Sequence, residues 1–315
     1  MRFSVDPWDP SYGASVQSDL GETTSVPVVD VERPAGAWAP IRPPERAARA
    51  DVVLFVDGVR RIDARTWIEG GVEAVPGVFA SWAAGVARCD GRARLADVEV
   101  ARGVFAPTRA IEDVATTCGR YLATPTSNAR PETLNTAINT RMTEVEARVA
   151  ERNRRASGEL IVLDGPLRES TRHLPEAVGV VKSHDVKYLP PELDAIVAAL
   201  GAGERTPVFR IDARFRRYSW YLRLPGPAGG PWAGIVRCEA GPALDASAVS
   251  ALADRVAATL PCYASEPHKD PRAPQNLYPI GGLERELRRR LGDPAVLYRA
   301  LRRASSTVSA AVAGG

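Results

Sequence analysis

The sequence predicts an α/β fold in which helices flank a mixed β-sheet. Apolar runs of strand length, such as residues 52–56 and 160–163, occur in both halves of the 315-residue chain. Residues 131–155 lie between them and place apolar side chains three and four positions apart, which is the periodicity of an amphipathic helix. A hydrophobic fraction of 45% is enough for a packed core at this length. Strands and helices therefore alternate within one large domain.

The ends of the chain differ from the middle in composition. Residues 1–48 are rich in Pro, Ser, Gly and Asp without sustained periodicity, so we expect an irregular arm. The folded domain is expected over residues 49–304, with a flexible tail of small residues at 305–315. No apolar run approaches the roughly 18 residues of a membrane helix. The N-terminus also lacks the basic and apolar stretches of an export signal, which favours a soluble, cytoplasmic protein.

The first half of the domain is expected to be an antiparallel meander. Residues 52–56 form an apolar strand that should end at Asp57-Gly58, because Asp-Gly favours turns. The alternating segment 61–67 would return as its hairpin partner, and further strands follow at 77–88 and 94–101.

The second half begins with one apolar strand at 159–163, which closes on a turn at Asp164-Gly165. The remaining elements are read from periodicity and turn residues. They are strands at 177–182, 208–211, 220–224 and 232–239, and helices at 191–200, 245–260, 282–291 and 294–303.

Two strands followed by Asp-Gly are the most informative feature of the sequence. Carboxylates at adjacent strand ends can share divalent cations, because hard ions such as Mg²⁺ and Mn²⁺ prefer oxygen ligands. Two such ions, roughly 3.5 to 4 Å apart, stabilise the attacking and leaving oxygens of a phosphodiester. A simple turn is the alternative explanation for each pair. Asp57 and Asp164 are therefore candidate metal ligands.

A third carboxylate could come from the helix that precedes the second of these strands. Glu146 follows the apolar residue Val145 and lies at the edge of the expected buried stripe, while Glu144 is the alternative. A solvated helix face is the other explanation for either glutamate.

Other site chemistries fit the sequence less well. The four cysteines form no C-x-x-C pair, and the three histidines lack the close spacing of zinc ligands. An aspartate after an apolar strand can be a covalent nucleophile, but the haloacid dehalogenase pattern requires a second aspartate where this chain has Val59. No G-x-x-x-x-G-K-[ST] phosphate loop is present for ATP chemistry.

Clusters of arginine with nearby aromatic residues favour a nucleic-acid partner, although the formal net charge is only +3. Solvated charge is the alternative explanation for any one cluster. The clusters are Arg60, Arg61 and Arg65; Arg214, Arg216 and Arg217 ahead of Tyr218 and Trp220; and Arg285, Arg288, Arg289 and Arg290.

Seven segments, which together cover roughly residues 51–291, carry a resemblance to a known family. They are, in order, VVLFVDGVRR, RMTEVEARVAER, ELIVLDGPLR, VGVVKSHDVKYLP, WYLRL, IVRCEA and QNLYPIGG. In residue content and order they resemble the NurA nuclease family. The resemblance implies a ribonuclease H-like fold and a metal-dependent deoxyribonuclease that processes DNA ends in double-strand break repair, as a 5′-to-3′ exonuclease, a single-strand endonuclease or both. The implied cofactor is Mn²⁺ (or Mg²⁺), and the implied partners are DNA, a HerA-like hexameric translocase and a second copy of the chain in a homodimer.

The same resemblance implies roles for individual residues. It assigns the metal ligands to Asp57, Glu146 and Asp164, and it places Lys182 where a lysine could contact a phosphate. Tyr278 would hydrogen-bond the substrate or a metal-bound water. Glu286 stands where the family often has a histidine, and as a carboxylate it could bind metal there. A catalytically silent module that binds DNA or the translocase is the alternative reading.

Overall fold

The computed structural model describes most of the chain. The described residues are 2–5, 26–45, 47–69, 73–182, 188–213, 215–226, 232–266, 268–270 and 273–313, with side chains left undescribed in 2–5 and 307–313. Much of the expected arm, Arg214 and the last two residues of the expected tail lie outside these ranges.

The described strands form one mixed sheet of eleven, in the order β5-β6-β4-β3-β2-β7-β8-β11-β10-β9, with β1 on β2. β2, β3 and β4 form the expected antiparallel meander, while β7 and β8 run parallel to β2. This arrangement is the α/β class with a mixed sheet that is expected for the chain. The strands are β1 (Arg2–Val5), β2 (Val53–Glu69), β3 (Val75–Cys89), β4 (Ala93–Ala106), β5 (Val114–Thr116), β6 (Gly119–Pro125), β7 (Leu160–Asp164), β8 (Ala177–Val181), β9 (Phe209–Asp212), β10 (Arg216–Arg223) and β11 (Ile235–Ala240).

One expected turn is wrong. β2 continues through Asp57-Gly58 as a single strand of 17 residues. Asp57 pairs with Gly85 and Gly58 with Ala84, so the ladder to β3 is unbroken at this point. The expected hairpin of 52–56 with 61–67 is therefore one strand, because long-range pairing with β3 overrides the local turn preference of Asp-Gly.

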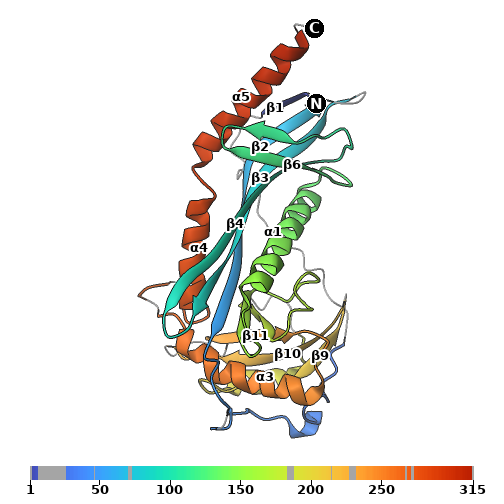
Figure 1. Ribbon diagram of the computed structural model, residues 1–315. Coiled ribbons are helices and arrows are strands. Elements are labelled where there is room, and N and C mark those ends of the chain that lie inside the picture. The colour runs from blue at the N-terminus through green and yellow to red at the C-terminus, as the bar shows by residue number, and fades with distance from the viewer. Residues whose placement is uncertain are drawn as a thin grey trace.

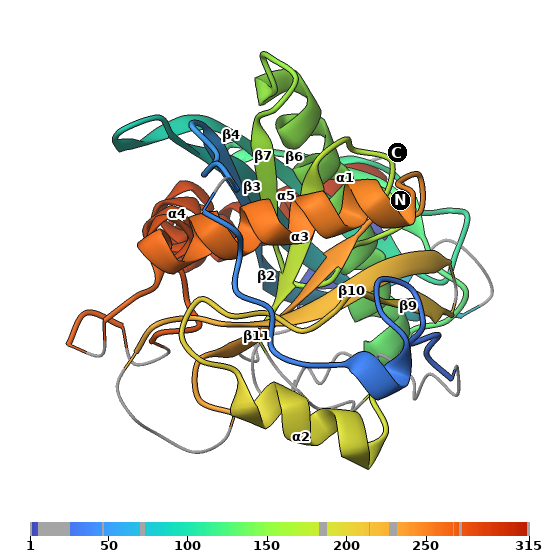
Figure 2. The ribbon, with the colours of Figure 1, turned by 90° about the horizontal axis from the view of Figure 1, so that it is seen from below.

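Helices cover both faces of the sheet. The five α-helices described are α1 (Pro131–Asn153), α2 (Pro191–Ala199), α3 (Ala246–Thr259), α4 (Tyr278–Arg290) and α5 (Pro294–Ala313). α1 and α4 flank the long strands from opposite sides (Figure 1), and α2 and α3 lie on opposite sides of β9 to β11 (Figure 2). Among the described residues, no helix is long and apolar enough to cross a bilayer.

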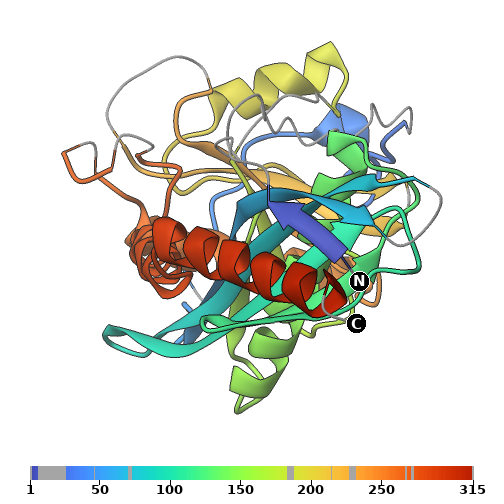
Figure 3. The same ribbon diagram turned by 90° about the horizontal axis from the view of Figure 1, so that it is seen from above.

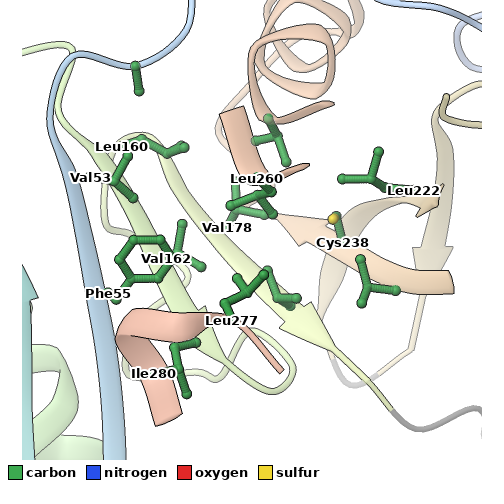
Figure 4. Packing of buried hydrophobic residues seen from close by; sticks show 14 of the residues in the cluster. Val53, Phe55, Leu160, Val162, Val178, Leu222, Cys238, Leu260, Leu277 and Ile280 are labelled. Carbon is green, nitrogen blue, oxygen red and sulfur yellow. The ribbon is translucent and has the colours of Figure 1, made fainter. Parts of the chain in front are cut away.

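Two buried clusters show which side chains share a face, because alternate residues of a strand point in opposite directions. Val53 and Phe55 pack with Ile280 of α4 in one cluster (Figure 4). Leu54 and Val56 pack with α1 in the other. We name these sides of the sheet the α4 face and the α1 face.

The upper end of the meander is closed by the last helix. α5 contacts β1, β2 and β5, and lies across the sheet beside β1 (Figure 3). Leu301 of α5 is buried with Phe79 and Tyr121 of the sheet. The backbone of α5 extends to Ala313, into the segment where a flexible tail is expected.

The described part of the arm, residues 26–45, docks on the domain. Val28 bridges Arg210, and Ile41 bridges Arg205. Glu32 receives two hydrogen bonds of 2.8 Å from the buried Arg205 guanidinium. Burial alone would raise the pKa of Glu32, but the hydrogen bond and charge of Arg205 outweigh it and lower the pKa to about 2. This ion pair fixes residues 26–45 to the sheet edge.

Candidate active site

Asp57 and Asp164 lie side by side on adjacent parallel strands. The last registered pair of β2 and β7 is Val56 with Leu163, and one aspartate follows in each strand. Asp57 alternates with Phe55 in β2, and Asp164 with Val162 in β7, so both project to the α4 face. Asp57 is 7% exposed, whereas the side chain of Asp164 is 25% exposed. The structure therefore brings these two predicted residues together.

Glu146 approaches Asp57 from the α1 face of the sheet. It lies on α1 and is 8% exposed. A Cβ placed on Gly58 would be 2.5 Å from Glu146 Oε1 and 2.9 Å from Met142 Cγ. The absence of a side chain at Gly58 thus lets the carboxylate approach the strand directly beside Asp57. Glu144 instead pairs with Arg141 at 3.1 Å on the exposed side of α1.

The three carboxylates affect one another electrostatically. Burial raises the pKa of Asp57 well above its usual range, and the charges of Asp164 and Glu146 raise it further. Lys182 opposes this increase. Burial also raises the pKa of Glu146 to about 8, against the lowering effect of Arg168 and with a further increase from Asp164. The site thus concentrates negative charge that a cation would stabilise.

Lys182 follows β8 and completes the α4 side of the site. Its Nζ lies 2.5 Å from Asp164 Oδ1 and donates a 2.7 Å hydrogen bond to Asn276 Oδ1. Asn276 in turn donates to Asp270 at 2.5 Å. Asn276 belongs to the QNLYPIGG segment, and only its place before Tyr278 could have marked it in the sequence.

Tyr278 and Glu286 lie on α4 but make other contacts. Tyr278 accepts a 3.3 Å hydrogen bond from Lys269. Glu286 is ion-paired with Arg289 and Arg290, whose hydrogen bonds lower its pKa to about 2. Both line a cavity of about 430 Å³ between the β3–β4 turn and α4. Neither has a described contact with the three carboxylates.

The donor chemistry of the site suits a hard divalent cation, since Asp57, Glu146 and Asp164 offer only carboxylate oxygens. The compact arrangement of a metal site is not present, however. Among the described residues, no three His, Cys, Asp or Glu side chains are placed to share one ion. The ligand set therefore fits a metal by charge and atom type, and its spacing would have to close on binding.

Two residues near the turn after Asp164, Arg168 and Glu239, were not singled out from the sequence. Gly165 has φ +93°, and its N–H donates to Val180 O at 2.9 Å. Arg168 lies four residues after Asp164, and its positive charge lowers the pKa of Glu146. Glu239 of β11 accepts the N–H of Leu167 at 2.9 Å. Arg237 and Glu239 alternate with apolar residues in β11, and this local pattern does not indicate the contact.

Comparisons with known proteins identify the family. A family model described as "NurA domain" matches residues 122–280, which is half of the chain and includes Glu146, Asp164, Lys182 and Tyr278. The NurA nuclease from Sulfolobus solfataricus is a similar solved structure, with 10% identity and a TM-score of 0.43 over 79% of this chain and 81% of that one. No curated protein matches the chain. The extent of the family match shows that the chain belongs to the NurA family of nucleases.

Proposed function

We propose that this nuclease is a metal-dependent deoxyribonuclease whose ligands are Asp57, Glu146 and Asp164. The observation that supports it most is the burial of two carboxylates beside a third, at the point where β7 ends alongside the middle of the longer strand β2. Burying like charges together is unfavourable unless a cation compensates them. Mn²⁺ or Mg²⁺ would supply Lewis-acid stabilisation of the phosphodiester and a nucleophilic water.

The protein residues have distinct tasks in this proposal. Asp57, held by a 2.7 Å hydrogen bond from the Gly58 N–H, and Glu146 provide fixed oxygens inside the fold. Asp164 is more exposed and can adjust to the substrate. Lys182 carries a compact positive charge at the same place, suited to a phosphate oxygen. Tyr278 remains a proposed contact to the substrate or a metal-bound water, and Glu286 a proposed metal-binding carboxylate, because α4 packs on the same sheet face as Asp57.

Family membership supports the wider role. We include in the proposal DNA-end processing in double-strand break repair, as a 5′-to-3′ exonuclease or single-strand endonuclease. A HerA-like hexameric translocase and a second copy of the chain are the proposed partners.

A catalytically silent module that binds DNA or the translocase is the second candidate. It is favoured by Glu286, which stands in place of a family histidine and is paired with two arginines. This candidate predicts DNA binding without cleavage.

Cleavage assays separate the two candidates. Labelled single- and double-stranded DNA would be incubated with the wild type, Asp164→Asn, Glu146→Gln and the matched control Glu144→Gln, in Mn²⁺, Mg²⁺ or chelator. We expect cleavage only with metal, and a loss of about 100-fold or more in the first two variants with DNA binding retained. The control should cut as the wild type does. Binding without cleavage under every metal would refute the deoxyribonuclease proposal and leave the silent module.

A further inference from the structure

Glu239 is a fully buried carboxylate that the proposed chemistry does not use. It lies on β11 opposite Gly179 of β8, on the α1 face of the sheet. We propose that Glu239 is a positioning residue, which holds the turn after Asp164 and thereby sets where the Asp164 carboxylate lies. This inference rests on the proposed function, because it concerns the geometry of the same site.

The contacts of Glu239 join two parts of the chain. Its Oε2 accepts the backbone N–H of Leu167 at 2.9 Å. Its Oε1 accepts a 2.9 Å hydrogen bond from Arg217 Nε and another from Arg237 Nη1. One oxygen therefore fixes the turn, while the other is held by two guanidinium groups, that of Arg217 on β10 and that of Arg237 on β11 itself.

Gly179 makes this reach possible. A Cβ at Gly179 would lie 2.6 Å from Leu167 N and 2.8 Å from Gly165 O. Any side chain there would push the turn away from β8, and Leu167 would leave hydrogen-bond range of Glu239. The close approach of backbone to backbone thus depends on glycine at this position.

The carboxylate itself has little freedom. The side chains of Arg237 and Arg217 are 6% and 12% exposed, and Arg237 also lies over the Tyr188 ring, 4.6 Å from its centroid. Hydrogen bonds to charged groups are stronger than neutral ones, and a buried charge that loses its partner is costly. Glu239 is therefore a rigid anchor for the Leu167 N–H.

Asp164 lies only three residues before Leu167, whose N–H Glu239 holds. The turn between them is held to the sheet by Gly165 N–H on Val180 O at one end and by Leu167 N–H on Glu239 at the other. Without the second contact, the turn can relax away from β8, and Asp164 can move relative to Asp57. Misplacement of a reacting group by about 1 Å can cost about 100-fold in rate.

Glu159 offers a matched control. It lies just before β7, at the opposite end of that strand from Asp164. It is 4% exposed, accepts the backbone N–H of Arg155 at 2.7 Å and pairs with Arg88 at 2.5 Å. Glu159 therefore has the same burial, the same kind of backbone contact and the same kind of arginine partner as Glu239.

The experiment compares Glu239→Gln with Glu159→Gln in the full chain. A glutamine cannot accept from the backbone N–H and from both arginines, because one of its two terminal groups is a donor. We expect metal-free hydrogen exchange in the peptide covering residues 164–171 to quicken by about 10-fold or more in Glu239→Gln alone. Mn²⁺-dependent cleavage should fall by about 10- to 100-fold in that variant and stay at the wild-type rate in Glu159→Gln.

A second variant guards against misfolding of the first. Arg217→Met/Arg237→Met/Glu239→Met removes all three buried charges together, a change that buried ion clusters often tolerate, and it should also speed exchange in the turn. Unchanged exchange and cleavage in both Glu239 variants would overturn the positioning role. A wild type that fails to cut DNA with any metal would instead refute the proposed function, while the exchange data would still report whether Glu239 holds the turn.

Discussion

The two Asp-Gly pairs have the same sequence and opposite structural circumstances. Asp57-Gly58 lies inside a continuous strand, and Gly58 is required by space, because Glu146 and Met142 occupy the place of a side chain. Asp164-Gly165 ends a strand, and Gly165 has open space around it but a left-handed φ of +93°. The first pair is buried among carboxylates and the second is partly exposed beside Lys182. A dipeptide that favours a turn can therefore serve either as a turn or as a gap for a neighbouring carboxylate.

The largest expected effect is a pH dependence of stability at the first pair. It comes from Glu146, the buried carboxylate beside Asp57-Gly58. The pKa of Glu146 is raised from 4.5 to about 8 in the folded chain, mainly by burial. Between these values the folded chain binds more protons than the unfolded chain, so stability falls as pH rises from about 4.5 to 8. Glu146→Gln should remove this loss and be more stable than the metal-free wild type at pH 9, by on the order of 2–4 kcal/mol.

Urea unfolding at pH 5 and pH 9 measures this effect, with Glu144→Gln as the control. Mn²⁺ should restore stability to the wild type at high pH more than to Glu146→Gln, because the cation needs the ionised carboxylate. Equal pH dependence in the wild type and Glu146→Gln would show that ionisation of Glu146 does not destabilise the folded chain.

The next largest effect distinguishes why glycine is required in each pair. At Gly58 there is no space for a side chain, and at Gly165 the backbone has a positive φ. Gly58→Ala should cost about 1–3 kcal/mol, because the new methyl group meets Glu146 Oε1 and Met142. Gly165→Ala should cost about 1–2 kcal/mol through backbone strain alone. Adding Glu146→Ala should recover much of the loss in Gly58→Ala and none of the loss in Gly165→Ala. Denaturant unfolding of the four variants tests this, and equal recovery in both backgrounds would contradict it.

These pairs also show what sequence reasoning could and could not supply. The antiparallel meander, the amphipathic α1 and the strand ending at Asp164 follow from local periodicity and turn residues, whereas the ribonuclease H-like mixed sheet is implied by the family resemblance. The passage of β2 through Asp57-Gly58 follows from neither, because the competing force is pairing with β3, some 28 residues away at Gly85. Likewise, spacing places Glu146 at the edge of the apolar stripe but leaves Glu144 as an alternative, and only the packing of α1 against the sheet shows which of them is buried.

The same limit applies to Glu239. An alternating strand pattern places Arg237 and Glu239 on one face, which ordinarily indicates a solvent-facing side. The turn at residues 165–167 covers that face because Gly179 leaves room for it. A tertiary contact of this kind has no local signature in the sequence.

The smallest expected effect belongs to the exposed pair. The side chains of Lys182 and Asp164 are 21% and 25% exposed, so solvent screens their 2.5 Å ion pair. Lys182→Met should therefore lower the free energy of unfolding by less than about 1 kcal/mol, and the loss should shrink in 1 M salt. Urea unfolding at two salt concentrations measures both. A salt-independent loss as large as that of Gly58→Ala would mean that Asp164 is held as rigidly as Asp57, because a screened, partly exposed ion pair cannot stabilise the fold to that extent.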